Sequence, residues 1–189
     1  MVCVRALIIV DVQNDFCAGG SIPVPGAAAL PAAINGYLAG DPDYQHIVAT
    51  KDFHINPGDH FSDHPDFSSS WPPHCIAGTA GAEFHPDLDT SRIEAVFYKG
   101  AFSGAYSGFE GVDENDTPLL DWLRQRQVDR VDVVGVATDY CVRMTSKDAV
   151  RAGFVTRVLL RLTAGAAPES SRDAIEDMRR AGISVVSSL

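Results

Sequence analysis

Six short runs of apolar, mostly β-branched residues are spaced along the whole chain, and they constrain its fold more than any other feature. The runs are Ala6–Val10, Ile47–Thr50, Ala95–Tyr98, Val131–Val136, Thr156–Leu160 and Ile183–Val186. Each run is nearly continuous, which indicates a strand that is covered on both faces. Strands of this kind are typical of parallel sheets with helices on both sides. The sequence therefore predicts a central, mostly parallel sheet of about six strands.

Stretches of helical character separate these runs. They are Ala27–Leu38, Leu119–Arg126, Tyr140–Ala152 and Ser170–Ala181. Thr117 and Pro118 fit a cap followed by proline at the first helical position, and Gly153 and Gly182 fit helix C-terminal ends. Repeated strand–helix units predict the α/β class, as a doubly wound α/β/α sandwich. No repeat or linker divides the 189 residues, so we expect one domain over residues 1–189.

Charge and cysteine content limit the partners and the compartment. The formal net charge is −10, which argues against nucleic acid and anionic membranes, because both attract clustered Lys and Arg. No apolar run approaches the ~20 residues that span a bilayer, and the first residues lack the layout of a signal peptide. The four cysteines lie far apart, which favours reduced thiols over a disulfide scaffold: Cys3, Cys17, Cys75 and Cys141. We expect a cytoplasmic protein that is a monomer or a weak homo-oligomer.

The segment between the second and third runs breaks the strand–helix pattern. Residues 53–88 show almost no periodicity and are rich in Gly, Pro, Ser, Asp and His. An irregular segment of this length in a compact domain is usually functional or disordered. One carboxylate and three imidazoles could close around a divalent cation here: Asp52, His54, His60 and His74. The sequence therefore predicts a metal-binding loop region over about residues 52–88.

A solvated loop is the ordinary interpretation of such histidines. We keep that interpretation for three others: His46, His64 and His85. Asp52 and His54 are two residues apart, which places both side chains on the same side of an extended chain and favours metal binding. Cys75 adjoins His74, and we interpret it as a packing residue. Mixed nitrogen and oxygen ligands suit Zn, Fe and Mn alike, with zinc and iron as the leading candidates.

Three further polar residues stand where other predicted strands end. Asp11 follows the first run, Lys99 follows the third, and Cys141 lies just past the fourth. Singly, they fit a cap, a solvated surface group and a core residue. Ligands of parallel sheets bind outside the carboxyl ends of the strands, so these residues and the metal group should converge on one edge. That shared position favours a catalytic site.

The chemistry of this set suits attack on an unactivated carbonyl. The first turn of the helix after the fourth strand and the Lys99 ammonium would lower the pKa of the Cys141 thiol. Asp11 could accept the thiol proton and later deliver it to a leaving group. Backbone N–H groups of residues 137–141 could form an oxyanion hole. The sequence thus predicts hydrolysis through a thioester.

Five segments also carry a resemblance to a known family. They are Ala6–Cys17, Thr50–His54, Ser69–Cys75, Phe97–Gly100 and Gly135–Val142. Together they resemble the isochorismatase-like cysteine hydrolases, and within them the nicotinamidase/pyrazinamidase branch. The similarity runs nearly end to end. It implies the same α/β fold, a small-molecule substrate, and an amidohydrolase that converts nicotinamide to nicotinate and ammonia and also acts on pyrazinamide.

The resemblance implies a role for each candidate residue. Cys141 would be the nucleophile, Asp11 the general base and then acid, and Lys99 the bridge between them. The implied oxyanion hole consists of the amides of Ala137 and Cys141, beside a cis peptide between Val136 and Ala137. One divalent ion, Zn or Fe before Mn, would be held with waters by four ligands: Asp52, His54, His60 and His74. The substrate would contact Phe16, Trp71, Tyr106, Val136 and Ala137.

Two positions depart from the family pattern, and three alternative functions stay open. Tyr140 precedes the nucleophile where relatives carry His, and Arg161 stands where relatives often have Asp. Another amidase of the superfamily would act on a ureido or carbamoyl substrate. Isochorismate hydrolysis would need neither the metal nor the thiol. A catalytically silent metal-binding or partner-binding domain would not need the trio Asp11, Lys99 and Cys141.

Overall fold

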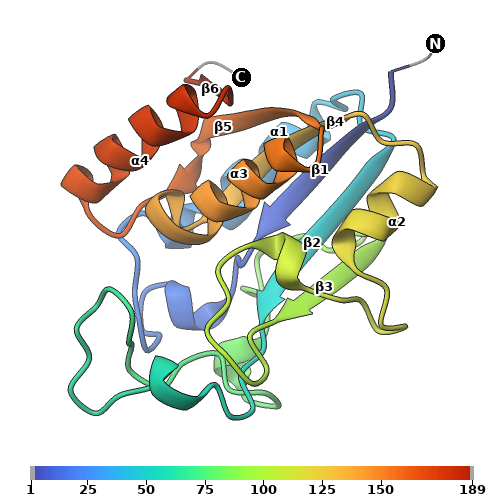
Figure 1. The fold of residues 1–189 in the computed structure, drawn as a ribbon. Helices are drawn as coiled ribbons and strands as arrows, with labels where there is room; N and C mark the ends of the chain where they lie inside the picture. Colours follow the sequence, from blue (N-terminus) through green and yellow to red (C-terminus); the bar gives the residue numbers. More distant parts are fainter. Residues whose placement is uncertain (1–2, 188–189) are drawn as a thin grey trace.

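A six-stranded sheet forms the centre of the protein, as a computed structural model covering residues 3–187 describes it (Figure 1). The strands are β1 (Arg5–Val10), β2 (His46–Asp52), β3 (Ala95–Lys99), β4 (Arg130–Val136), β5 (Val155–Ala164) and β6 (Ser184–Val186). Strands β1 to β5 each contain one of the predicted apolar runs, whereas β6 begins one residue after the start of the sixth run, at Ser184. Residues 1, 2, 188 and 189, the ends of the predicted domain, lie outside the described range.

All neighbouring strands are parallel, in the order β3-β2-β1-β4-β5-β6. The chain builds outward from β1 to β3 and then returns to the other side of β1 with β4. The strand order therefore reverses between β1 and β4, and in open α/β sheets ligands bind outside the carboxyl ends at such a point.

Helices cover both faces of the sheet, which confirms the predicted α/β/α sandwich. The α-helices are α1 (Leu30–Ala39), α2 (Leu119–Gln125), α3 (Arg143–Arg151) and α4 (Pro168–Arg180). In β1, Leu7 and Ile9 pack with α1 in one apolar cluster, whereas Ala6, Ile8 and Val10 pack with α2, α3 and α4 in the other (Figure 1). Burial on both faces explains why the strand is a continuous apolar run. None of the helices within residues 3–187 has the length and apolar character of a bilayer crossing.

Short helical turns lie mostly in the connections. They are η1 (Asn14–Phe16), η2 (Ala27–Ala29), η3 (Gly58–His60), η4 (Ala80–Ala82), η5 (Gly108–Glu110) and η6 (Thr138–Val142). The predicted helix from Tyr140 therefore begins as the π-helical turn η6, and its α-helical part starts only at Arg143. Thr117 does not cap α2, because the N-cap position is Pro118 and no side chain caps it. Turns of the π type are frequent at functional sites.

The predicted irregular region between β2 and β3 is ordered by main-chain bonds instead of long elements. The His54 N–H donates to the Cys75 carbonyl, and the Ala77 N–H donates to the His54 carbonyl. The Trp71 N–H donates to the carbonyl of His60, which draws the two ends of residues 61–70 together. These bonds bring His54, His60 and His74 together near the carboxyl ends of the strands.

Gly135 is the position in β4 where only glycine fits. Its φ is +113°, and a Cβ there would lie 2.1 Å from the Val10 carbonyl oxygen of β1. We expect Gly135→Ala to lower the free energy of unfolding by about 3 kcal/mol or more, through left-handed strain and a backbone clash. Urea denaturation measures this effect. The control is Gly36→Ala, exposed in α1 with open space around it, which should leave stability equal or higher. Equal stabilities of the Gly135 variant and the parent would contradict the packing at β1 and β4.

Candidate active site

Four strands deliver one polar residue each to the same edge of the sheet. Asp11 follows β1, Asp52 and Lys99 end β2 and β3 in register with each other, and Cys141 lies in η6 after β4. Because the strands are parallel, their carboxyl ends point toward one side of the molecule (Figure 1). The structure thus brings together the four residues that the sequence placed at strand ends.

Lys99 lies at the centre of this cluster. Its Nζ is 2.9 Å from Asp11 Oδ2 and 3.6 Å from Cys141 Sγ. It also donates to an Asp52 carboxylate oxygen and, at 3.3 Å, to the Ala105 carbonyl. All four residues of the cluster are buried: Asp11, Asp52, Lys99 and Cys141. One cation therefore contacts the acid, the thiol and the carboxylate that faces the histidines.

Burial and mutual charge set the protonation of the cluster. Burial raises the pKa of the Cys141 thiol well above its ordinary value, and the nearby Lys99 ammonium opposes that rise. This differs from the expectation of a lowered thiol pKa, because desolvation outweighs the attraction of one lysine. Burial likewise raises the pKa of the Asp11 carboxyl, again opposed by Lys99. Burial opposes the charge on Lys99, but Asp11 and Asp52 outweigh it and raise the pKa of the ammonium.

Asp11 has an uncommon backbone conformation. Its φ is +50°, in the left-handed region that non-glycine residues seldom adopt. The Thr50 hydroxyl donates to Asp11 Oδ1 at 2.6 Å, and the Asp11 N–H donates to the Thr50 carbonyl at 3.2 Å. Strained residues of this kind concentrate at functional sites, where surrounding bonds hold them. Thr50 thus fixes the carboxylate beside Lys99.

Three imidazoles form a cage next to this cluster. His54, His60 and His74 each offer a ring nitrogen, and these nitrogens lie within 4.8 Å of one another. The His54 Nδ1–H donates to the Gly100 carbonyl at 2.6 Å, and the His74 Nδ1–H donates to the Pro72 carbonyl at 2.8 Å. Backbone partners of this kind leave Nε2 free as a ligand atom. His54 Nε2 is fully buried and has no hydrogen-bond partner within residues 3–187.

Asp52 connects the cage with the lysine cluster. Its Oδ2 lies 3.8 Å from the Nε2 atoms of both His54 and His74, while its other oxygen accepts from Lys99. Burial and the neighbouring imidazoles lower the pKa of His60 to about 4, which keeps its ring neutral. A neutral imidazole is the form that binds a metal. The donor set, one carboxylate and three imidazoles with an unpaired buried nitrogen, therefore fits a divalent cation.

Gly100, the residue directly after β3, supports the cage. Its φ is +77°, and a Cβ there would lie 2.7 Å from His54 Cε1. We expect Gly100→Ala to weaken zinc binding about 10-fold to 100-fold, because the His54 ring and its carbonyl partner must move. Competition with a chromogenic chelator measures the affinity, with Gly36→Ala as the matched control. Unchanged zinc affinity in the Gly100 variant would show that the His54–Gly100 contact does not position a ligand.

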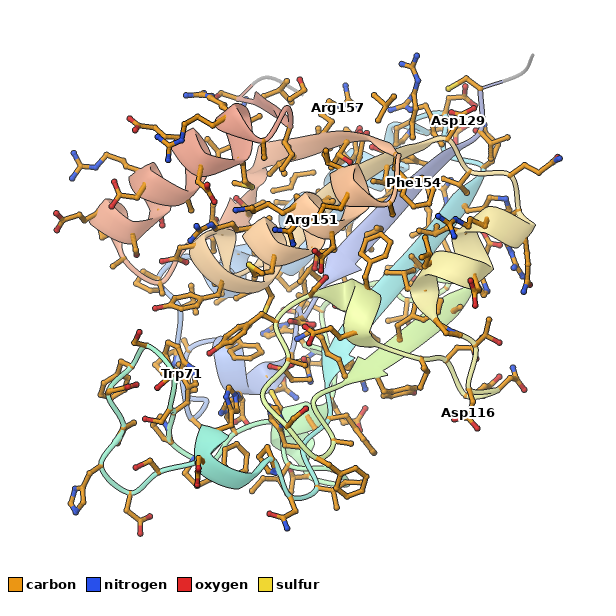
Figure 2. The ribbon with its side chains drawn as sticks, in the orientation of Figure 1. Trp71, Asp116, Asp129, Arg151, Phe154 and Arg157 are labelled. Atoms are coloured by element: carbon orange, nitrogen blue, oxygen red, sulfur yellow. The ribbon has the colours of Figure 1, made fainter. Side chains whose placement is uncertain are left out.

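A cavity lies beside the Cys141 thiol. Its walls include Cys141 and the five predicted contact residues: Phe16, Trp71, Tyr106, Val136 and Ala137. Asp52, His60 and His74 also line it, so the thiol and the cage face one space. Trp71 lies in the loop region beyond the arrowheads of β1–β3 (Figure 2). The peptide bond between Val136 and Ala137 is cis.

Several residues that support the site were not predicted. Besides Thr50, the buried Gln13 holds the main chain of Asp52 on both sides, donating to its carbonyl at 2.8 Å and accepting from its N–H at 2.9 Å. Asp15 accepts from the Cys75 N–H at 2.7 Å and so fixes the segment that carries His74. Their signal in the sequence is weak, because Thr50 looks like an ordinary strand residue and Gln13 and Asp15 look like ordinary turn residues after a strand.

The residues that the sequence analysis set aside as ligands are outside the three-histidine cluster. His46 pairs with Glu94 at 3.0 Å, His85 lies 3.9 Å from Asp87, and His64 is exposed. Cys75 is fully buried in the apolar cluster on the α1 face. Arg161, one of the two departures, is exposed on β5, and no ion pair involves it within residues 3–187.

Comparison with known proteins finds one matching family, similar sequences and similar solved structures. Residues 5–188 match the isochorismatase domain family. The nicotinamidase/pyrazinamidase of Mycobacterium tuberculosis is 70% identical over 184 residues, 97% of this chain and 99% of that protein. The structure of PnC1 from L. infantum in complex with nicotinate has a TM-score of 0.85 and 36% identity, covering 98% of this chain and 96% of that one. The pyrazinamidase of Pyrococcus horikoshii in complex with zinc has a TM-score of 0.81 and 37% identity, covering 96% and 98%.

Proposed function

The chain belongs to the isochorismatase family, and on that premise we propose that it is a nicotinamidase, which hydrolyses nicotinamide to nicotinate and ammonia. Pyrazinamide, whose ring also carries a nitrogen and a carboxamide, is converted to pyrazinoate by the same route. One observation carries the proposal: Lys99 joins Asp11 and Cys141 under an aromatic cavity that the histidine cage also faces.

Cys141 acts as the nucleophile in this proposal. Its Sγ bonds to the carboxamide carbon while the thiol proton passes to Asp11, which gives a tetrahedral oxyanion. The carbon–nitrogen bond then breaks, and the proton on Asp11 leaves with the nitrogen as ammonia. Water attacks the remaining thioester, nicotinate departs, and the thiol regains its proton. The raised pKa of both groups supports a proton that moves between them.

Lys99 and the backbone supply the electrostatic part of the reaction. The ammonium beside Cys141 Sγ stabilises the thiolate as it forms and keeps Asp11 in place. The amides of Ala137 and Cys141 serve as the oxyanion hole, and both residues line the cavity. Phe16, Trp71 and Tyr106 line the cavity and enclose the flat ring of the substrate.

Asp52, His54, His60 and His74 would hold one divalent ion, with zinc or iron as first candidates and manganese as another. When bound, this ion would supply a positive charge that attracts the ring nitrogen of the substrate. The unpaired His54 Nε2 supports this ligand set, since a buried nitrogen without a partner is costly.

Ammonia release tests the function directly. The purified protein should release ammonia from nicotinamide and pyrazinamide, and removal of metal by a chelator should suppress the rate until metal is restored. A ureido or carbamoyl substrate and isochorismate serve as comparison substrates. Faster hydrolysis of a comparison substrate than of nicotinamide and pyrazinamide would overturn the proposal. A protein that hydrolyses none of these substrates would also overturn it.

A further inference from the structure

A second hollow adjoins the cavity above Cys141 and shares a wall with it. The inner cavity has a volume of about 50 Å³, and this outer hollow has about 370 Å³. The residues that line only the outer hollow include Pro23, Phe67, Ala167 and Ser170. Five residues line both spaces and form the partition: Ile22, Val24, Trp71, Tyr140 and Ala166. The small inner cavity is therefore separated from a much larger space by one layer of side chains.

Tyr140, like Trp71, contacts two other aromatic rings, and it joins the partition to the wall of the inner cavity. Its ring meets Trp71 edge-on at a centroid distance of 5.1 Å and stacks with Tyr106 at 6.0 Å. Such arrangements stabilise aromatic pairs beyond their buried area. Tyr140 also precedes Cys141 in η6, so its backbone is fixed by the turn that positions the thiol. Its ring is therefore a packed wall of the inner cavity.

Hydrogen bonds hold this wall in place from the opposite loop. The Tyr140 hydroxyl donates to the Phe67 carbonyl at 3.2 Å, and the Tyr106 hydroxyl donates to the Ser68 carbonyl at 3.4 Å. The Trp71 indole N–H donates to the Tyr106 hydroxyl at 3.0 Å. The loop thus covers the cavity as a unit that is tied to its aromatic wall.

The far wall of the outer hollow depends on the residue before Tyr140. Asp139 is buried, and its carboxylate accepts from the Ala166 N–H at 2.9 Å and from the Ser170 hydroxyl at 2.5 Å. Consecutive residues of η6 therefore anchor both sides of the partition. The Asp139 bonds are made by a side chain other than the Tyr140 ring, so a substitution of that ring removes neither partner of these bonds.

We propose that Tyr140 is a specificity-determining residue, whose ring closes the inner cavity against the outer hollow and limits the substrate to single-ring carboxamides. This inference rests on the proposed amidase function. A pyridine carboxamide enlarged by a second ring meets Tyr140, whereas the outer hollow beyond it has the volume and the apolar wall to take that ring.

The test compares the parent enzyme with Tyr140→Ala and with Tyr140→Phe, which keeps the ring and loses only the hydroxyl. The substrates are nicotinamide, quinoline-3-carboxamide and 5-phenylnicotinamide, whose second rings extend from different edges of the pyridine. We expect Tyr140→Ala to raise kcat/KM for at least one two-ring amide relative to nicotinamide by about tenfold or more. Tyr140→Phe should leave that ratio within about threefold of the parent, because the wall is still present. Because both kcat/KM values in this ratio come from the same preparation, a loss of folded enzyme lowers both equally and leaves the ratio unchanged.

Two outcomes are separated by the same experiment. A parent enzyme that hydrolyses nicotinamide, with a ratio unchanged in Tyr140→Ala, would overturn the inference alone. A parent enzyme inactive on nicotinamide would overturn the proposed function. Equilibrium dialysis of nicotinate and quinoline-3-carboxylate then decides the size question without turnover: equal relative affinities in parent and Tyr140→Ala would contradict the role of the ring.

Discussion

Replacing Cys141 with alanine should lower kcat for nicotinamide by about 10⁴-fold or more, because no other group can form the covalent intermediate. Cys141 Sγ lies 3.6 Å from Lys99 Nζ and lines the cavity, whereas Cys75 and Cys17 are buried in the apolar cluster on the α1 face. Stopped-time ammonia assays at saturating nicotinamide measure the effect. Zinc content should stay at the parent value, because the thiol is outside the predicted ligand set.

The matched control is Cys3→Ala. Cys3 is exposed and its Sγ hydrogen-bonds to Asp129, which lies at the opposite end of the molecule from Trp71 (Figure 2). This variant should keep the parent rate within about twofold, since distant surface changes seldom alter a site. A Cys141→Ala enzyme that retained a tenth of the parent rate would mean that water attacks the amide directly.

The second large effect concerns the metal. His54→Ala and His74→Ala should each reduce bound zinc from about one ion per chain to below about 0.1 after dialysis, because each removes one of four ligands. Backbone carbonyls hold both imidazoles through Nδ1, which leaves Nε2 of each ring as the ligand atom that the substitution removes. Elemental analysis after dialysis against a weak chelator measures the content, and nicotinamide hydrolysis should fall with it.

His64→Ala is the matched control for the cage. His64 belongs to the same irregular segment but is exposed and makes no contribution to the ligand cluster. Its variant should keep a full equivalent of zinc. If His54→Ala also kept a full equivalent, the ion would bind elsewhere and the assignment of the cage would be wrong.

The sheet could be predicted from sequence because burial on both faces leaves a plain signature. Leu7 and Ile9 belong to one apolar cluster and Ile8 and Val10 to the other, so no polar residue lies between Ala6 and Val10. The start of the helix after β4 could not be predicted in the same way. Thr138 to Val142 adopt a π-helical turn, and no local residue pattern distinguishes such a turn from the start of an α-helix.

The site was partly predictable for a related reason. Asp11, Asp52, Lys99 and Cys141 stand at strand ends, and parallel topology alone brings strand ends together. Thr50 and Gln13 act through hydrogen bonds to residues 39 positions away, which no local pattern reveals. The direction of the Cys141 pKa shift could not be predicted either, because it depends on how fully the folded chain buries the thiol. The roles of these residues stay predictions that the variants above test.

Mass spectrometry of enzyme quenched with acid during nicotinamide turnover tests the central claim most directly. The account predicts a protein adduct with the mass of a nicotinoyl group, removed by hydroxylamine and located on the peptide that contains Cys141. An adduct on any other residue, or ammonia release by Cys141→Ala at the parent rate, would contradict it.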